Sequence, residues 1–167
     1  MLAASGELDL SMGGAFVPAA RTDEGQFIIN EKDQNYRRRS IYLQQRRTKP
    51  VTMLAMFDGE HIGLNCMRRN VSTVPLQSLA MLNAEFVRHR SAKFAERALS
   101  SSQDPESRLQ FAFSTAYTRP AKDEELTMGK DFLITQLAAY NGVDAEKKAW
   151  SDLCQMLLAS NSFLYLE

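Results

Sequence analysis

The sequence predicts a mainly α-helical fold, an irregular bundle of about five helices with an extended N-terminal arm that can include a small two-stranded β-ribbon. Apolar residues recur at three- and four-residue steps through most of the chain after residue 50, which is the period of an amphipathic helix. Proline, glycine and capping residues separate these segments. The 167 residues are predicted to form one domain, with the arm and ribbon in 1–50 and the helical core in 51–167.

The first fifty residues carry the arm and the ribbon. Residues 1–26 are rich in glycine, alanine and serine, and Gly13-Gly14 and Pro18 interrupt any helical period, so we expect an extended arm. Two β-favourable runs follow at 27–29 and 41–43, and they can pair as a ribbon. The second run can instead begin a helix, because good helix formers follow it.

The helical core begins with a short helix and a long one. Pro50 keeps the preceding residue extended, and the short helix spans 51–57 before Asp58-Gly59 ends it. Thr73 is the predicted cap of a long helix over 75–99. We expect the amide of Asn83, beside its apolar stripe, to bond to backbone of the preceding loop. The residues of this stripe are Leu76, Leu79, Leu82, Phe86, Val87, Phe94 and Ala98.

Three further helices complete the predicted bundle. Asp104 is the predicted cap of a helix over 105–117, and a helix over 124–140 ends at Asn141-Gly142. Asp144 is the predicted cap of the last helix. Residues 163–166 are too apolar to remain in water, so we expect them to dock on the bundle. The apolar stripe of the last helix is Trp150, Leu153, Cys154, Leu157 and Leu158.

Composition restricts the classes of function. Lysine plus arginine equals aspartate plus glutamate, 20 of each, so no overall charge favours a polyanion or an anionic membrane. We expect no membrane-spanning helix and no signal peptide. Neither Cys66 nor Cys154 belongs to a haem-attachment motif, and with His61 and His89 they are too scattered for a zinc site, so we expect no cofactor and no metal in this chain.

A turn at 58–61 and an arginine-rich segment are the candidates for chemistry. Asp58, Glu60 and His61 could form a general acid/base pair or a weak cation site, although a solvated turn is the favoured interpretation. The basic run over 37–49 includes tyrosines, which suits nucleic acid, but pairing of its arginines with carboxylates is favoured because the total charge is neutral. The binding candidates are Arg38, Arg39, Tyr42, Arg68, Arg69, Asn83 and Arg119. We expect Arg68, Arg69 and Asn83 mainly to fix how the loop meets the long helix.

Several ordered blocks point to a family. They are Leu2-Ala3-Ala4-Ser5-Gly6, Arg38-Arg39-Ser40-Ile41-Tyr42, Phe57-Asp58, Arg68-Arg69, Thr73-Val74-Pro75-Leu76, Leu82-Asn83, Tyr117-Thr118-Arg119-Pro120 and Leu157-Leu158-Ala159-Ser160-Asn161. In this order they resemble the uncharacterised C-terminal domain of large secreted planctomycete proteins, which often carry a cytochrome-c-like domain as well. The resemblance implies that the chain is the C-terminal portion of that domain and has a periplasmic or secreted location. It also implies that any haem belongs to a separate upstream domain.

Three hypotheses about function follow. The leading one is a non-catalytic structural or interaction module of a secreted multidomain protein, whose partners are the upstream portion of the same parent protein and other protein domains. The second is a hydrolase acting on an anionic or sugar-like polymer, with Asp58 or Glu60 as the acid/base. The third and least favoured is weak nucleic-acid binding through the arginine-rich segment.

Overall fold

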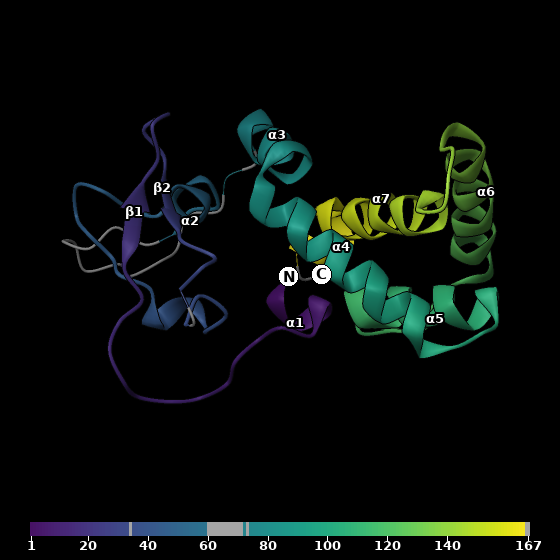
Figure 1. Cartoon of the computed structure of the whole chain (residues 1–167), viewed down its shortest axis with the longest axis horizontal. Coiled ribbons are helices and arrows are strands. Elements are labelled where there is room, and N and C mark those ends of the chain that lie inside the picture. Colours follow the sequence, from purple (N-terminus) through teal and green to yellow (C-terminus); the bar gives the residue numbers. More distant parts are fainter. Residues whose placement is uncertain (34, 60–71, 73, 166–167) are drawn as a thin grey trace. The chain divides into compact units, whose positions relative to one another are not determined.

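The computed structural model is mainly helical, with a small antiparallel β-sheet, as the sequence predicts. It describes residues 1–33, 35–59, 72 and 74–165, and Thr73, the predicted cap, lies outside them. None of the described helices is long and apolar enough to cross a membrane. The elements in chain order are α1 (Leu2–Ser5), β1 (Ala19–Arg21), β2 (Phe27–Ile29), the 3₁₀ helix η1 (Ser40–Tyr42), α2 (Thr52–Met56), α3 (Pro75–Asn83), α4 (Glu85–Ser101), α5 (Pro105–Tyr117), α6 (Asp123–Ala139), α7 (Ala145–Ala159) and α8 (Asn161–Leu164) (Figure 1).

The chain folds as two compact units. We call residues 1–7 and 81–167 the helical unit, and residues 8–80 the ribbon unit. The prediction of a single domain with a division near residue 50 stays a prediction.

The helical unit is built around α4 and α7, which pack on each other. In Figure 1, α6 lies across the ends of α5 and α7. The predicted stripe of α7 is confirmed, because all five of its members are buried. Asp104 caps α5 as expected, accepting a hydrogen bond from the Ser107 N–H at 2.8 Å. Asp144 precedes α7 but makes no side-chain cap bond.

The first seven residues are not an extended arm but part of the helical unit. The Arg97 guanidinium donates to the carbonyl oxygens of Ala3 and Ala4 at 3.1 and 3.0 Å, which satisfies the C-terminal end of α1. Arg90 lies 3.1 Å from the Glu7 carboxylate, and only 3% of the Arg90 side chain is exposed. These two arginines of α4 therefore hold the N-terminal segment, a long-range contact that a local sequence pattern does not encode.

The predicted helix over 75–99 is two helices, α3 and α4. Ala84 leaves the helical conformation with ψ 129°. The Gln155 amide donates to the carbonyl oxygens of Met81 and Leu82 at 3.0 and 2.8 Å, so a side chain of α7 supplies bonds at the end of α3. Beyond the break the predicted stripe is buried at Val87, Phe94 and Ala98, whereas Leu76, Leu79 and Leu82 on α3 are 60%, 55% and 60% exposed.

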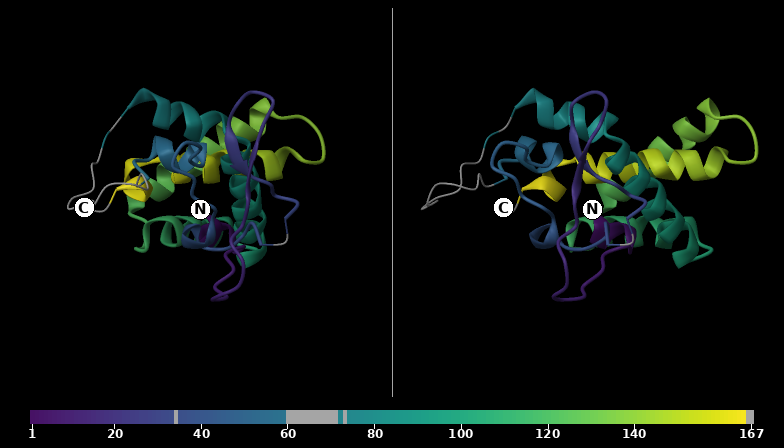
Figure 2. Two further views of the ribbon diagram at one scale, coloured as in Figure 1. Left: turned by 90° about the vertical axis from the view of Figure 1, so that its left-hand side faces the viewer. Right: turned by 60° about the vertical axis from the view of Figure 1, so that its left-hand side comes forward.

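The β-ribbon has a different partner strand from the one predicted. β2 pairs with β1, with Ala19 opposite Ile29, and the run at 41–43 lies mostly in η1 (Figures 1 and 2). The turn between the strands explains the pairing, because the Thr22 hydroxyl accepts from the Gln26 N–H at 3.1 Å and Gly25 adopts φ 86°.

Candidate interaction groove

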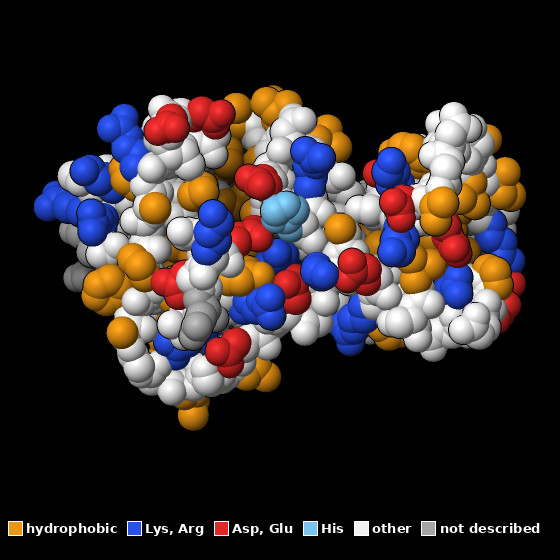
Figure 3. Space-filling model, viewed as in Figure 1, with side chains coloured by type: hydrophobic (Ala, Val, Ile, Leu, Met, Phe, Trp, Pro, Cys, Tyr) orange, Lys and Arg blue, Asp and Glu red, His pale blue; other side chains and the backbone are white. Residues whose placement is uncertain are grey.

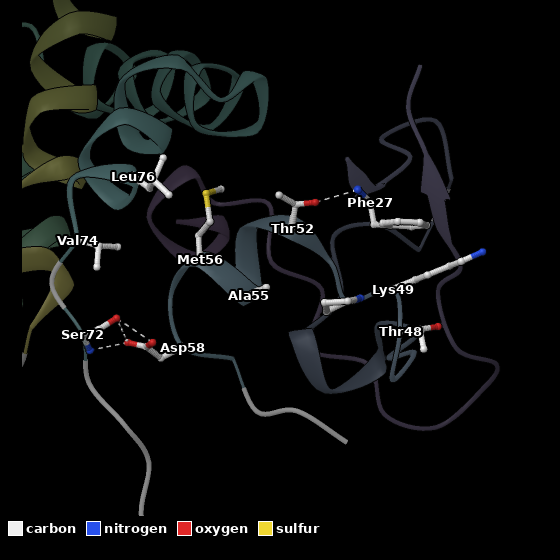
Figure 4. A pocket seen from close by; sticks show the side chains of 11 residues that line it. Phe27, Thr48, Lys49, Thr52, Ala55, Met56, Asp58, Ser72, Val74 and Leu76 are labelled. Carbon is white, nitrogen blue, oxygen red and sulfur yellow. Dashed lines mark hydrogen bonds between the residues drawn. The ribbon is translucent and has the colours of Figure 1, made fainter. Parts of the chain in front are cut away.

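The ribbon unit contains an open groove of about 510 Å³. Side chains of β2, the turn before Pro50, α2 and the start of α3 line it. In Figure 4, Met56, Val74 and Leu76 gather at one end of the groove, and Phe27 and Lys49 lie at the other. Most of the lining is apolar, and the groove is open to solvent along its length.

Helix α2 forms one wall, and its two ends are fixed by specific bonds. At its start, the Thr52 hydroxyl accepts from the Phe27 N–H at 2.8 Å, which ties α2 to β2. At its end, Asp58 has φ 55° and the Gly59 N–H donates to the Leu54 carbonyl at 2.8 Å. A Cβ on Gly59 would lie 2.6 Å from that carbonyl oxygen, so only glycine fits this turn.

The start of α3 forms the second wall, and polar side chains join it to α2. The Asp58 carboxylate accepts from the Ser72 N–H at 2.6 Å and from the Ser72 hydroxyl at 2.9 Å (Figure 4). Gln77, which is 5% exposed, donates its amide to the carbonyl oxygens of Met56 and Ser72 at 2.9 and 3.0 Å. These bonds bring the end of α2 and the start of α3 together, because the buried amide would otherwise lack partners.

Asp58 is therefore part of the wall and is hydrogen-bonded through both carboxylate oxygens. The other two acid/base candidates, Glu60 and His61, lie outside the described residues, as do Arg68 and Arg69. Among the described residues no three histidine, cysteine, aspartate or glutamate side chains form a metal-binding group.

The turn that borders the groove is basic. Thr48 and Lys49 line the groove, and the Lys49 N–H donates to the Arg46 carbonyl at 3.2 Å, which keeps residues 46–49 compact. The ammonium nitrogen of Lys49 lies 5.9 Å from the centre of the Phe27 ring, within cation–π range. Figure 3 shows basic side chains gathered at the left-hand edge of the view, over segments of the ribbon unit.

For four cations of this basic segment, the structure shows no pairing with a described carboxylate. Arg39, Arg46, Arg47 and Lys49 are exposed, and none forms an ion pair with a described aspartate or glutamate. The sequence explains why: no acidic residue occurs between Asp33 and Asp58. The neutral total charge of the chain concealed this local excess.

Three predicted binding residues meet around the Gly13-Gly14 loop. Arg38 is 4% exposed and donates to the carbonyl oxygens of Ser11, Gly13 and Ala15, and its guanidinium lies 3.8 Å from the centre of the Tyr42 ring. The Tyr42 hydroxyl accepts from the Gly13 N–H at 3.3 Å and from Arg39 at 3.4 Å. The Gly13 bond is the main cause of a lowered Tyr42 pKa, and the Arg39 charge adds to it. The buried Arg38 side chain therefore holds the loop of residues 11–15 in place.

Arg119 and Asn83 belong to the helical unit. Arg119 pairs with both oxygens of Glu125, at 2.7 and 2.8 Å, and this hydrogen bonding lowers the Glu125 pKa from 4.5 to about 2. Asn83 is exposed at the end of α3, and its expected bond to backbone of the preceding loop falls on residues 60–71 and 73, which lie outside the described residues.

Sequence reasoning missed the groove residues Phe27, Met56 and Leu76, because they come from three separate segments. It assigned Leu76 to a buried stripe, although this side chain is 60% exposed. The signal available in the sequence was the acid-free stretch over 34–57, which contains six arginines and lysines.

The fold and the groove define a mainly helical protein with an open, mainly apolar groove. The chain belongs to the PSD1 family, described as proteins of unknown function (DUF1553), whose family model matches residues 1–133. Membership of an uncharacterised family is thus confirmed. No curated protein and no solved structure matches the chain.

Proposed function

We infer that this protein is a non-catalytic interaction module that binds a partner protein through the groove of the ribbon unit. The observation that carries the inference is the exposed apolar surface at the start of α3. Leu76 lines the groove, and Leu79 follows three residues later on the same side of the helix, 55% exposed. Side chains of this kind gain about 1.5–3 kcal/mol each when a partner removes them from water.

The fixed walls support binding rather than reaction. Asp58 and Gln77 use their polar atoms to join the walls, so the groove presents mainly carbon atoms to a partner. Concave apolar surfaces with few polar groups suit the capture of side chains from another chain. On the resemblance described above, we place this module in a secreted planctomycete protein that can also carry a cytochrome-c-like domain.

Peptide display tests the proposal. A random twelve-residue library is selected on the immobilised full chain, and the enriched peptides are titrated against Leu76→Gln, Ala55→Gln and the control Met128→Gln. Both groove substitutions are at exposed helical positions, so folding is preserved, and Met128 is 69% exposed on α6. We expect the groove variants to bind about tenfold more weakly, because one apolar contact is lost or obstructed, and the control to bind like the wild type.

Two results would overturn the proposal. One is a library that yields no peptide above background. The other is a set of peptides that bind the groove variants and the wild type equally. Circular dichroism melting curves check that each variant remains folded.

A further inference from the structure

The basic turn beside the groove has no counter-charge within the described part of the chain. Arg46, Arg47 and Lys49 are exposed, and none forms an ion pair with a described carboxylate. They belong to the stretch between Asp33 and Asp58, which contains no acidic residue. Clustered cations of this kind attract an anionic partner and raise its association rate.

The charge and the apolar surface meet at Lys49. Its ammonium nitrogen lies 5.9 Å from the centre of the Phe27 ring, and both residues line the groove. A long lysine side chain can lie along an apolar surface while its ammonium group stays in water. A ligand in this groove would therefore place an apolar group near Phe27 and an anionic group beside Lys49.

The other end of the groove does not attract a cation strongly. Among the described residues that line the groove, Asp58 is the acidic one, and its two oxygens already accept bonds from Ser72. The charge that the described lining offers to a ligand is consequently positive and lies at Lys49, and the exposed Arg46 and Arg47 precede it in the same turn.

Aromatic groups distinguish a peptide from a nucleic acid as the ligand. Single-stranded nucleic acid is held by aromatic rings on which its bases stack. The Tyr42 ring is covered by the Arg38 guanidinium at 3.8 Å, and the Phe27 ring is only partly exposed, with the Lys49 ammonium close to it. These contacts favour apolar side chains accompanied by carboxylates.

We propose that the groove binds a short peptide segment that combines apolar residues with aspartate or glutamate, with its carboxylates beside Arg46, Arg47 and Lys49. The inference rests on the proposed function and specifies the chemistry of its partner. The apolar side chains occupy the surface formed by Met56 and Leu76. Surface ion pairs contribute modestly, so the cations supply selectivity and the apolar contacts supply most of the affinity.

Fluorescence anisotropy tests the proposal with four labelled probes. The first is a ten-residue peptide in which two leucines are flanked by aspartate and glutamate. The second replaces the acids by lysine, and the third replaces the leucines by serine. The fourth is a twelve-nucleotide oligothymidylate. Each is titrated against the full chain at 50 mM and 300 mM NaCl.

Two double variants with the same change in net charge locate the effect. Arg47→Glu with Lys49→Glu reverses the turn, whereas Arg88→Glu with Lys147→Glu reverses two exposed cations of the helical unit. We expect the wild type to bind the acidic peptide at least tenfold more tightly than the lysine peptide. The turn variant should bind the acidic peptide at least tenfold more weakly than the wild type does. The control variant should bind it less than about threefold more weakly, because exposed charges further away are screened.

The outcomes separate this inference from the proposed function. Equal binding of the acidic and lysine peptides, or no binding of the acidic peptide, overturns the charge inference, while display-selected peptides that still depend on Leu76 leave the interaction module in place. Tighter binding of the oligothymidylate than of the acidic peptide overturns the peptide assignment in favour of nucleic acid. If no display-selected peptide binds in a way that depends on Leu76, the proposed function itself is refuted.

Discussion

The Arg119–Glu125 ion pair stabilises the helical unit in a pH-dependent way. Arg119 follows α5, and its guanidinium binds both carboxylate oxygens of Glu125 in the first turn of α6. The same carboxylate also accepts from the Lys122 N–H at 2.8 Å. The pair therefore fixes the entry into α6 as well as joining two charges.

The magnitude follows from the pKa of Glu125, which is lowered from 4.5 to about 2, chiefly by its hydrogen bonds with Arg119. At about 1.4 kcal/mol per pH unit, the full difference corresponds to about 3 kcal/mol. The Arg119 side chain is 37% exposed, however, and water screens the pair. We therefore expect Glu125→Gln to lower the free energy of unfolding by about 1–2 kcal/mol at pH 7.

The sign of the pH dependence follows from the direction of the pKa change. Because the Glu125 pKa is lower in the folded state, the stabilisation is complete above about pH 5 and is lost as the pH falls from 4.5 through 2. The stability difference between wild type and Glu125→Gln should therefore shrink towards zero near pH 2. Glu124→Gln, one residue earlier and exposed, is the matched control and should cost less than about 0.5 kcal/mol.

Urea unfolding followed by the fluorescence of Trp150 measures these differences between pH 7 and pH 2.5. This residue is the single tryptophan of the chain and is 3% exposed in the helical unit. The reasoning would be refuted if Glu125→Gln lowered the free energy of unfolding no more than Glu124→Gln does. It would also be refuted if the difference in stability between the wild type and Glu125→Gln did not change with pH.

Three further predictions concern the helical unit. Glu7→Ala should lower the free energy of unfolding by about 1–3 kcal/mol in urea melts, because it removes the carboxylate 3.1 Å from the buried Arg90 guanidinium; an unchanged free energy of unfolding would contradict this contact. Cys154 is fully buried, and burial raises its thiol pKa, so in a Cys66→Ser background Ellman's reagent should react only after urea unfolds the chain; rapid native reaction would argue against this packing. Gly129→Val should lower the free energy of unfolding by about 1–3 kcal/mol in thermal melts, because a Cβ placed at this position would lie 3.1 Å from a leucine side chain of α5. An unchanged melting temperature would mean that α5 and α6 pack differently.

Local signals account for the parts of the fold that sequence reasoning predicted correctly. Asp104 followed by proline marks the start of α5, and the cap bond to Ser107 is present. The stripe of α7 has a strict helical period, and its members are buried. In both helices the residues that decide the structure are within four positions of one another, so a short window contains the necessary information.

The break at Ala84 depends on a contact from far along the chain. The helical period continues through this residue, and the Gln155 amide that binds the carbonyl oxygens at the end of α3 is more than seventy positions away. The apolar residues before and after the break look alike in sequence. Tertiary packing alone decides that Val87 is buried and Leu76 is exposed.

The arginine-rich segment shows a similar limit for the candidate site. Adjacent arginines have different environments: Arg38 is buried against carbonyl oxygens and the Tyr42 ring, whereas Arg39 is exposed. A run of like charges does not indicate which member the fold will bury, because the carbonyl groups that bind Arg38 come from residues 11–15. The groove escaped prediction for the same reason, since its walls are separate segments.

Hydrogen–deuterium exchange of the full chain with and without a display-selected peptide tests the central claim, that the groove of the ribbon unit is the interaction surface. The account predicts slower exchange in the peptide complex confined to the segments that line the groove, namely residues 27–29, 48–56 and 74–79. The same segments should show clearly less protection when the peptide is added to Leu76→Gln at a concentration near the dissociation constant of the wild type. Protection that falls instead on α5, α6 and α7, or that is equal for the wild type and Leu76→Gln, would contradict the claim.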